Sequence, residues 1–71
     1  MSDARTFLAE ALGVPADALP DAPRLGEPAA WDSIGHMRLV LALEARMGRP
    51  LAAEEMLDLD GLADVARLLD A

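Results

Sequence analysis

The sequence contains no cysteine, no tyrosine and no lysine, and its 71 residues include only one histidine and two aromatic side chains, Phe7 and Trp31. Without cysteine, neither a disulfide framework nor a thiolate metal site can form, and we predict no metal centre. No apolar run is long enough to span a bilayer, and the first residues do not resemble a secretory signal. We therefore expect a cytoplasmic protein with no membrane partner.

Charge of positive sign is also scarce, since six arginines stand against thirteen acidic residues and the net charge is −7. Binding to nucleic acid requires a basic face that neutralises phosphates, so this balance argues against a nucleic-acid partner. The same balance argues against an anionic membrane surface. A basic patch on another protein stays compatible with this charge, because opposite charges speed the encounter.

Alanine and leucine dominate the composition, with fifteen and thirteen copies respectively. Both favour helices, whereas the β-branched and aromatic residues that strands prefer are few. A chain of this length forms one small domain, which we place at residues 1–71 and expect to be a monomer. The predicted fold is all-α, a four-helix bundle with three main helices, a short third helix and a long first loop.

Caps and helix-breaking residues divide the chain into these elements. The first helix begins after Ser2 or Asp3 and ends at Gly13, and the second runs from Asp32 or Ser33 to about Met47, before Gly48. Four prolines within residues 14–31 predict the long loop. In the first helix, the core-facing residues should be Phe7, Leu8, Ala11 and Leu12. In the long loop, we expect Leu19 and Leu25 to anchor the chain to the core and Asp17 to begin a single helical turn. After the second helix, we expect a short helix over 52–57 and a last helix capped by Asp58 or Asp60.

The second predicted helix carries two apolar stripes, although an amphipathic helix ordinarily buries one. Leu39, Val40, Leu43 and Met47 form the stripe that we expect in the core. The other stripe consists of Ile34, Met37 and Leu41. Either the long loop covers this second stripe, or it is an exposed docking strip for partner proteins, and we favour the docking strip.

Three interpretations compete for Ser33, which opens this helix. Taken alone, Asp32-Ser33 is most simply a helix cap. Catalysis with His36 as a base is disfavoured, because no Gly-x-Ser-x-Gly elbow is present. The third interpretation is an attachment point: the hydroxyl is exposed on a rigid element, and the positive helix end suits a phosphodiester. Gly35 would keep the first turn narrow for an approaching protein.

The tripeptide Asp32-Ser33-Ile34, followed by Met37, Leu41 and the run 42–48, resembles the signature of acyl carrier and peptidyl carrier proteins. The resemblance extends over the order of helices and the long loop. It implies that a phosphopantetheinyl transferase attaches 4′-phosphopantetheine from coenzyme A to Ser33, with Asp32 as cap and recognition neighbour. Acyl, aminoacyl or peptidyl groups would then be bound as thioesters to the terminal thiol of this phosphopantetheine arm, and the chain itself would not be an enzyme. The partner-binding residues that it implies are Ile34, Met37 and Leu41. We expect Met56 to join this surface, and Arg38 to contribute to partner binding through its charge.

The chain departs from the family pattern in two ways. Trp31 stands where the family often has glycine, and we expect it to staple the helix start to the loop rather than to pack beside the arm. The second helix is not acidic, since His36, Arg38 and Arg46 stand against Glu44.

The charge of the second helix, together with a C-terminal run over residues 62–69 that resembles a peptidyl carrier ending, favours a stand-alone carrier of a specialised pathway with aminoacyl or unusual acyl cargo. Its expected partners are the transferase, an acyl- or aminoacyl-loading ligase or adenylating enzyme, and a downstream acyltransferase or synthase. The alternative is an unmodified helical adaptor that binds a protein through Ile34, Met37 and Leu41.

Overall fold

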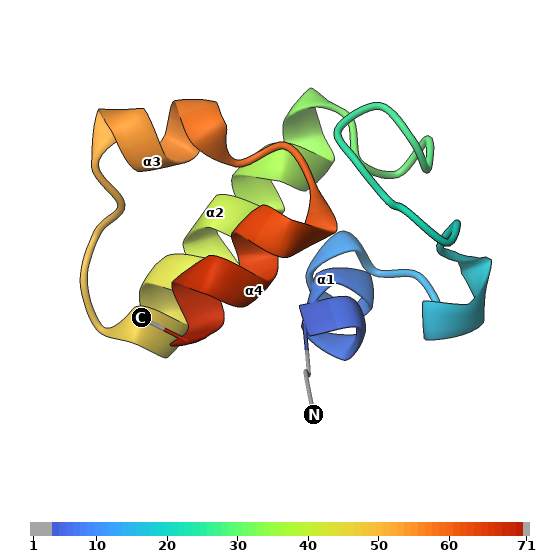
Figure 1. Ribbon diagram of the computed structural model, residues 1–71, viewed down its shortest axis with the longest axis horizontal. Coiled ribbons are helices and arrows are strands. Elements are labelled where there is room, and N and C mark those ends of the chain that lie inside the picture. The colour runs from blue at the N-terminus through green and yellow to red at the C-terminus, as the bar shows by residue number, and fades with distance from the viewer. Residues whose placement is uncertain (1–3, 71) are drawn as a thin grey trace.

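A computed structural model of the chain describes residues 4–70, in which helices are joined by loops and no strand is formed (Figure 1). The order of elements confirms the all-α prediction, including the short third helix and the long first loop. The predicted cap at Ser2 or Asp3 lies outside the described residues. The elements are α1 (Ala4–Leu12), the 3₁₀ turn η1 (Ala16–Ala18), α2 (Ser33–Met47), α3 (Ala53–Asp58) and α4 (Leu62–Asp70).

Both ends of α2 are set by local chemistry. Asp32 is the N-cap, and its Oδ1 accepts a hydrogen bond of 2.8 Å from the Gly35 amide. At the other end Gly48 adopts a left-handed conformation with φ 74°, and its amide donates to the Glu44 carbonyl at 2.9 Å. These caps confirm the predicted limits of the helix, and they hold Ser33 at a defined position, the first residue of α2.

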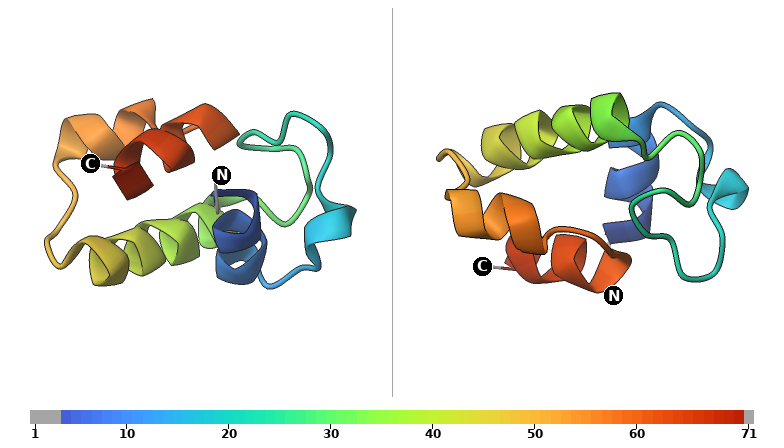
Figure 2. Two further views of the ribbon diagram at one scale, coloured as in Figure 1. Left: turned by 60° about the horizontal axis from the view of Figure 1, so that its bottom comes forward. Right: turned by 90° about the horizontal axis from the view of Figure 1, so that it is seen from above.

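The helices α1, α2 and α4 pack against one another around a single apolar cluster. Figure 2 shows α1 beside the N-terminal part of α2, with the α3–α4 segment facing α2 from the opposite side. Leu39, Val40 and Leu43 lie in the core, whereas Met47 is only half-buried. The other core residues are Ala4, Leu8, Ala9, Leu12, Leu19, Trp31, Leu51, Leu59, Val65 and Leu68.

The short helix α3 lies at the edge of this cluster and buries none of its own residues. Its position is held from both sides, because Leu51 and Leu59, which flank it, are buried. Arg49 also makes a two-pronged ion pair with Glu55, with both N–O distances at 2.9 Å. Glu55 Oε1 accepts a further bond from the Ala52 amide at 2.9 Å, which caps the first turn of α3.

This ion pair predicts an acid-dependent loss of stability. The hydrogen bonds from Arg49 and then from Ala52 lower the pKa of Glu55 from 4.5 to about 2. A pKa depressed in the folded state contributes stability that is complete above pH 4.5 and disappears as the pH falls through about 2. We expect Glu55→Gln to lower the free energy of unfolding at pH 7, and the difference from wild type to vanish near pH 2.

Urea unfolding followed by circular dichroism from pH 7 to pH 2 measures this difference. Glu54→Gln is the matched control, because it removes the same charge from an exposed neighbour on α3 that makes no ion pair within residues 4–70. A Glu55→Gln protein whose deficit is the same at pH 7 and pH 2 contradicts the prediction.

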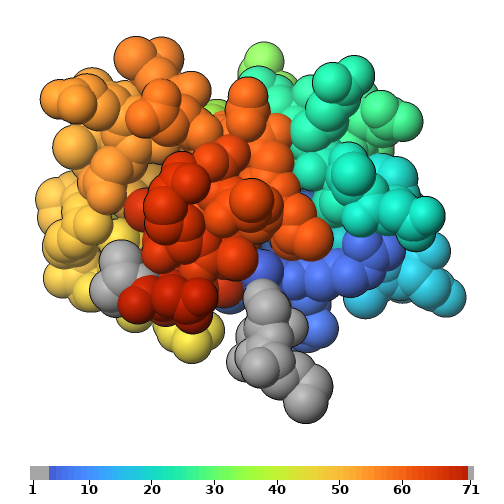
Figure 3. All heavy atoms as spheres, in the orientation of Figure 1, coloured from blue at the N-terminus to red at the C-terminus, as the bar shows by residue number. Residues whose placement is uncertain are grey.

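The loop between α1 and α2 is bound to the helices at several points and forms part of the surface beside α4 (Figure 3, teal to green). The Arg5 guanidinium donates to the carbonyls of Leu19 at 2.8 Å and Pro20 at 2.9 Å. Leu19 is buried and the turn η1 contains Asp17, as the sequence predicts. The predicted anchor at Leu25 is wrong, because this side chain is 45% exposed and only its amide is held, by the Asp60 carbonyl at 2.9 Å.

The start of α4 differs from the prediction as well. Neither Asp58 nor Asp60 caps this helix through its side chain within the described hydrogen bonds. Instead, Asp64 Oδ2 accepts from the amides of Asp60 at 3.2 Å and Gly61 at 3.0 Å. The correction has a simple cause: a carboxylate in the first turn of α4 reaches back to the amides that precede the helix.

None of the helices described is both long and apolar enough to cross a membrane.

Candidate functional site

Ser33 combines an exposed side chain with the first position of α2. Within residues 4–70 its hydroxyl has no hydrogen-bond partner, and the amides of Ser33 and Ile34 have no acceptor. The next two amides are occupied, since Gly35 donates to the Asp32 side chain and His36 donates to the Asp32 carbonyl at 2.7 Å. One hydroxyl and two unused N–H donors are therefore grouped at the start of the helix.

This grouping is suited to an anion on the serine oxygen. The N-terminal end of a helix carries partial positive charge, and its unpaired amides point toward the solvent, where an anion can accept them. The carboxylate of Asp32 is the nearest negative group in the sequence, and its Oδ1 is already engaged by Gly35. A phosphate ester on Ser33 therefore fits the residues present, with the amides of Ser33 and Ile34 as donors.

Trp31 and His36 form a second feature of this helix start. Trp31 is completely buried, and its Nε1–H donates to His36 Nδ1 at 3.0 Å. The two ring planes are nearly parallel, with 6.4 Å between centroids and 15° between planes, so the rings meet edge to edge through this hydrogen bond. These residues occupy the positions of a hydrophobic staple, one before the N-cap and one a turn into the helix. The predicted staple role of Trp31 is confirmed; its partner His36 was missed, although their five-residue spacing is the signal.

Gly35 has a different role from the one predicted. It is buried, and a Cβ placed on it would lie 2.0 Å from the Ala30 carbonyl oxygen and 3.1 Å from Leu12 Cδ2. The narrow first turn of α2 thus admits the loop and α1, not an approaching protein. This correction follows from the side of the helix on which Gly35 lies: it faces the interior, whereas Ser33 and Ile34 face outward.

An apolar surface, which we call the α2 strip, consists of Ile34, Met37 and Leu41. Their side chains are 67%, 56% and 58% exposed, so the long loop does not cover them. On α3, Met56 is half-buried against the core, while its neighbour Leu57 is 83% exposed. Leu57 was missed by the sequence reading, which could not tell which side of so short a helix faces the core.

The charged side chains of α2 itself are mostly positive. Arg38 and Arg46 are exposed on α2. Glu44 is the only acidic residue of this helix, and its Oε2 accepts the Leu51 amide at 2.9 Å, which holds the connection to α3. On α3 and α4 together, five acidic residues stand against one arginine, so these helices are more acidic than α2.

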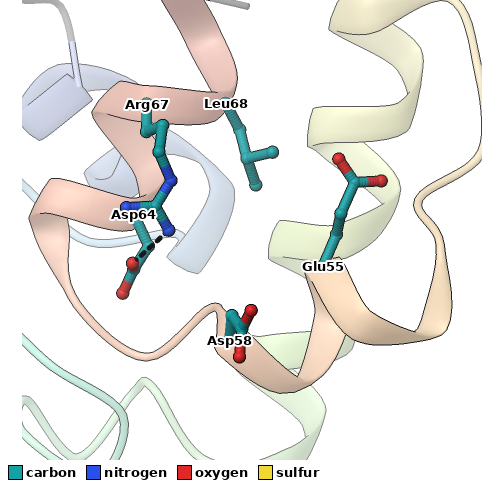
Figure 4. Close-up of a pocket in the computed structure, with 5 residues that line it drawn as sticks. All are labelled: Glu55, Asp58, Asp64, Arg67 and Leu68. Atoms are coloured by element: carbon teal, nitrogen blue, oxygen red, sulfur yellow. Dashed lines mark hydrogen bonds and ion pairs between the residues drawn. The ribbon is translucent and has the colours of Figure 1, made fainter.

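A pocket of about 220 Å³ lies between α3 and α4, apart from the residues of the Ser33 site and the α2 strip (Figure 4). Arg67 pairs with Asp64 at 2.6 Å across its rim. Within residues 4–70, no three histidine or carboxylate side chains are grouped so that they could hold a metal ion. The lining residues are Glu55, Asp58, Asp64, Arg67 and Leu68.

Comparison with protein families shows that the chain matches the family described as phosphopantetheine attachment site, over residues 3–69. The matched range includes Ser33, the helices α1, α2 and α3, and all of α4 except its last residue. Comparison with the curated proteins and with the solved structures gives no significant match.

Proposed function

Because this chain belongs to the phosphopantetheine attachment family, whose domains carry 4′-phosphopantetheine, we propose that Ser33 is the residue that bears this group. The observation that carries the proposal is the exposed Ser33 hydroxyl beside the unpaired amides of Ser33 and Ile34. Residues 1–71 would then form one carrier domain. In this proposal Asp32 keeps α2 capped and gives the modifying enzyme an acidic neighbour to recognise.

The attachment is a phosphoryl transfer in which this chain supplies the nucleophile. A bond forms between Ser33 Oγ and the phosphorus next to the pantetheine of coenzyme A, and the bond to the adenosine half breaks. Adenosine 3′,5′-bisphosphate leaves, and the hydroxyl proton passes to a base of the transferase. The bound group supplies a terminal thiol for thioester chemistry, which a chain without cysteine otherwise lacks.

We infer that the chain is a carrier and a substrate of enzymes rather than an enzyme. Its partners are a phosphopantetheinyl transferase, a loading ligase or adenylating enzyme, and a downstream acyltransferase or synthase. Docking is assigned to the α2 strip with Arg38 at its edge, joined on α3 by Met56 or the more exposed Leu57. The positive side chains of α2 would repel a partner whose docking patch is basic, as in the enzymes of fatty-acid synthesis. We therefore infer that the cargo is an acyl or aminoacyl group of a specialised pathway.

The test is incubation of the unmodified protein with coenzyme A and a broad-range transferase, followed by mass spectrometry. We expect a gain of one phosphopantetheine, and peptide mapping should place it on Ser33. A protein that several transferases leave unmodified contradicts the proposal.

A second candidate function, an unmodified helical adaptor, is favoured by the exposure of the α2 strip alone. Both functions need the strip for docking, so Met37→Glu tests the strip itself. Placing a charge in an apolar contact requires its desolvation, and we expect transferase-catalysed modification to slow about tenfold, which corresponds to about 1.4 kcal/mol.

Ala63→Glu is the matched control, because it adds the same charge at an exposed position of α4. Equal modification rates for Met37→Glu and Ala63→Glu, measured by time-resolved mass spectrometry, would show that the transferase does not use the strip. The adaptor function differs in one further respect: it requires activity to survive the loss of the Ser33 hydroxyl.

A further inference from the structure

The hydrogen bond between Trp31 and His36 decides where the imidazole carries its proton. An indole N–H can only donate, so His36 Nδ1 must accept and cannot itself be protonated while the 3.0 Å bond exists. In the neutral ring the proton is therefore on Nε2. The bond from the buried Trp31 to Nδ1 thus leaves Nε2–H of His36 as a hydrogen-bond donor.

This donor is not used inside the protein. Among the described residues Nδ1 is the only ring nitrogen of His36 in a hydrogen bond, and no buried side-chain nitrogen is left without a partner. Because His36 is half-buried, an unpartnered Nε2 must be in contact with solvent. The hydrogen bond from the buried Trp31 to Nδ1 orients the imidazole, so a ligand would find the Nε2–H already positioned.

His36 follows Ser33 by three residues on α2. Residues three apart on a helix are neighbours on its surface, and side chains tilt toward the N-terminal end. From this helix geometry we expect the imidazole on the side of the turn that begins with Ser33, where the amides of Ser33 and Ile34 are unpaired. The first turn of α2 thus contains three donors without an acceptor among the described residues, namely the amides of Ser33 and Ile34 and the Nε2–H of His36.

We propose that His36 Nε2–H donates a hydrogen bond to the phosphate of the group on Ser33, with Trp31 as the residue that fixes the imidazole for this contact. The inference rests on the proposed attachment at Ser33. His36 is then a positioning residue: it holds the phosphodiester at the base of the arm, and through it the direction in which the arm leaves the α2 surface.

Nuclear magnetic resonance can test this contact without ambiguity, because the chain has one histidine and the modified protein has one phosphorus. In the unmodified protein we expect the imidazole nitrogens to report the Nε2–H form. After modification the Nε2 and Hε2 signals should shift, and exchange of Hε2 with water should slow. Imidazole signals that are identical before and after modification overturn the inference.

Two variants separate the donor from the staple. His36→Gln keeps an N–H near the position of Nε2, whereas His36→Asn keeps an acceptor near the position of Nδ1 and lacks the far donor. We expect the phosphorus signal of modified His36→Asn to move toward that of the urea-unfolded protein, and that of His36→Gln to stay near wild type. If His36 serves only the staple, the phosphorus signal of His36→Asn matches wild type, and the inference is wrong.

The outcomes also distinguish this inference from the proposed function. If no phosphopantetheine is added to Ser33, both are overturned. If it is added and neither the imidazole nor the phosphorus signals respond, only the contact with His36 is overturned. Should either variant fail to fold, as judged by the near-ultraviolet signal of Trp31, the comparison of unmodified and modified wild type still decides the question.

Discussion

Ser33→Ala is expected to abolish phosphopantetheine attachment completely. The proposed reaction needs a hydroxyl oxygen at the first position of α2, and alanine removes that atom. The fold should be unaffected, because within residues 4–70 the hydroxyl makes no hydrogen bond and the cap of α2 is Asp32. We expect a circular dichroism spectrum and a melting temperature near those of wild type, together with no mass gain after incubation with coenzyme A and transferase.

The matched control is Thr6→Ala, which removes another exposed hydroxyl, on α1. This variant should be modified at the wild-type rate. A Ser33→Ala protein that still gains one phosphopantetheine would move the attachment point to another residue. A different outcome would favour the adaptor function: wild type is modified, yet the Ser33→Ala protein keeps its activity in the cell.

Gly35→Ala is expected to destabilise the fold, which reverses the usual effect of this change within a helix. Alanine ordinarily stabilises a helix by about 1 kcal/mol relative to glycine. Here the new Cβ would lie 2.0 Å from the Ala30 carbonyl oxygen, and this neighbour is backbone rather than the end of a flexible side chain. The loop must move away from α2, and we expect a net loss of about 2–3 kcal/mol.

For a domain of this size such a loss lowers the melting temperature by roughly 10–20 °C. Thermal unfolding followed by circular dichroism measures the change. Gly61→Ala is the matched control, since its backbone is unstrained and the nearest atom to the new Cβ is Asp64 Oδ2 at an ordinary 3.7 Å. It should change stability by less than about 0.5 kcal/mol. A Gly35→Ala protein as stable as wild type would mean that the loop does not pack on this turn.

The sequence by itself determined the order of the helices and the limits of α2, because these depend on neighbours along the chain. Asp32 caps the beginning of α2 by accepting from the Gly35 amide, and Gly48 caps its end by donating to the Glu44 carbonyl. The spacing of Leu39, Val40 and Leu43 identified the core side of α2, since three- and four-residue steps return to one face. The residue pattern around Ser33 was likewise local, and it sufficed to indicate the family.

Only the tertiary structure decided which apolar and small residues meet across the chain. Leu19 is buried while Leu25 is not, and Met56 turns toward the core while Leu57 turns away. Gly35 is required because Ala30 and α1 approach it, and His36 becomes a donor because Trp31 binds its other nitrogen. Each outcome depends on the packing of segments against one another. Packing is collective: hydrophobicity selects residues for burial, and the geometry of the assembled helices decides which of them are buried.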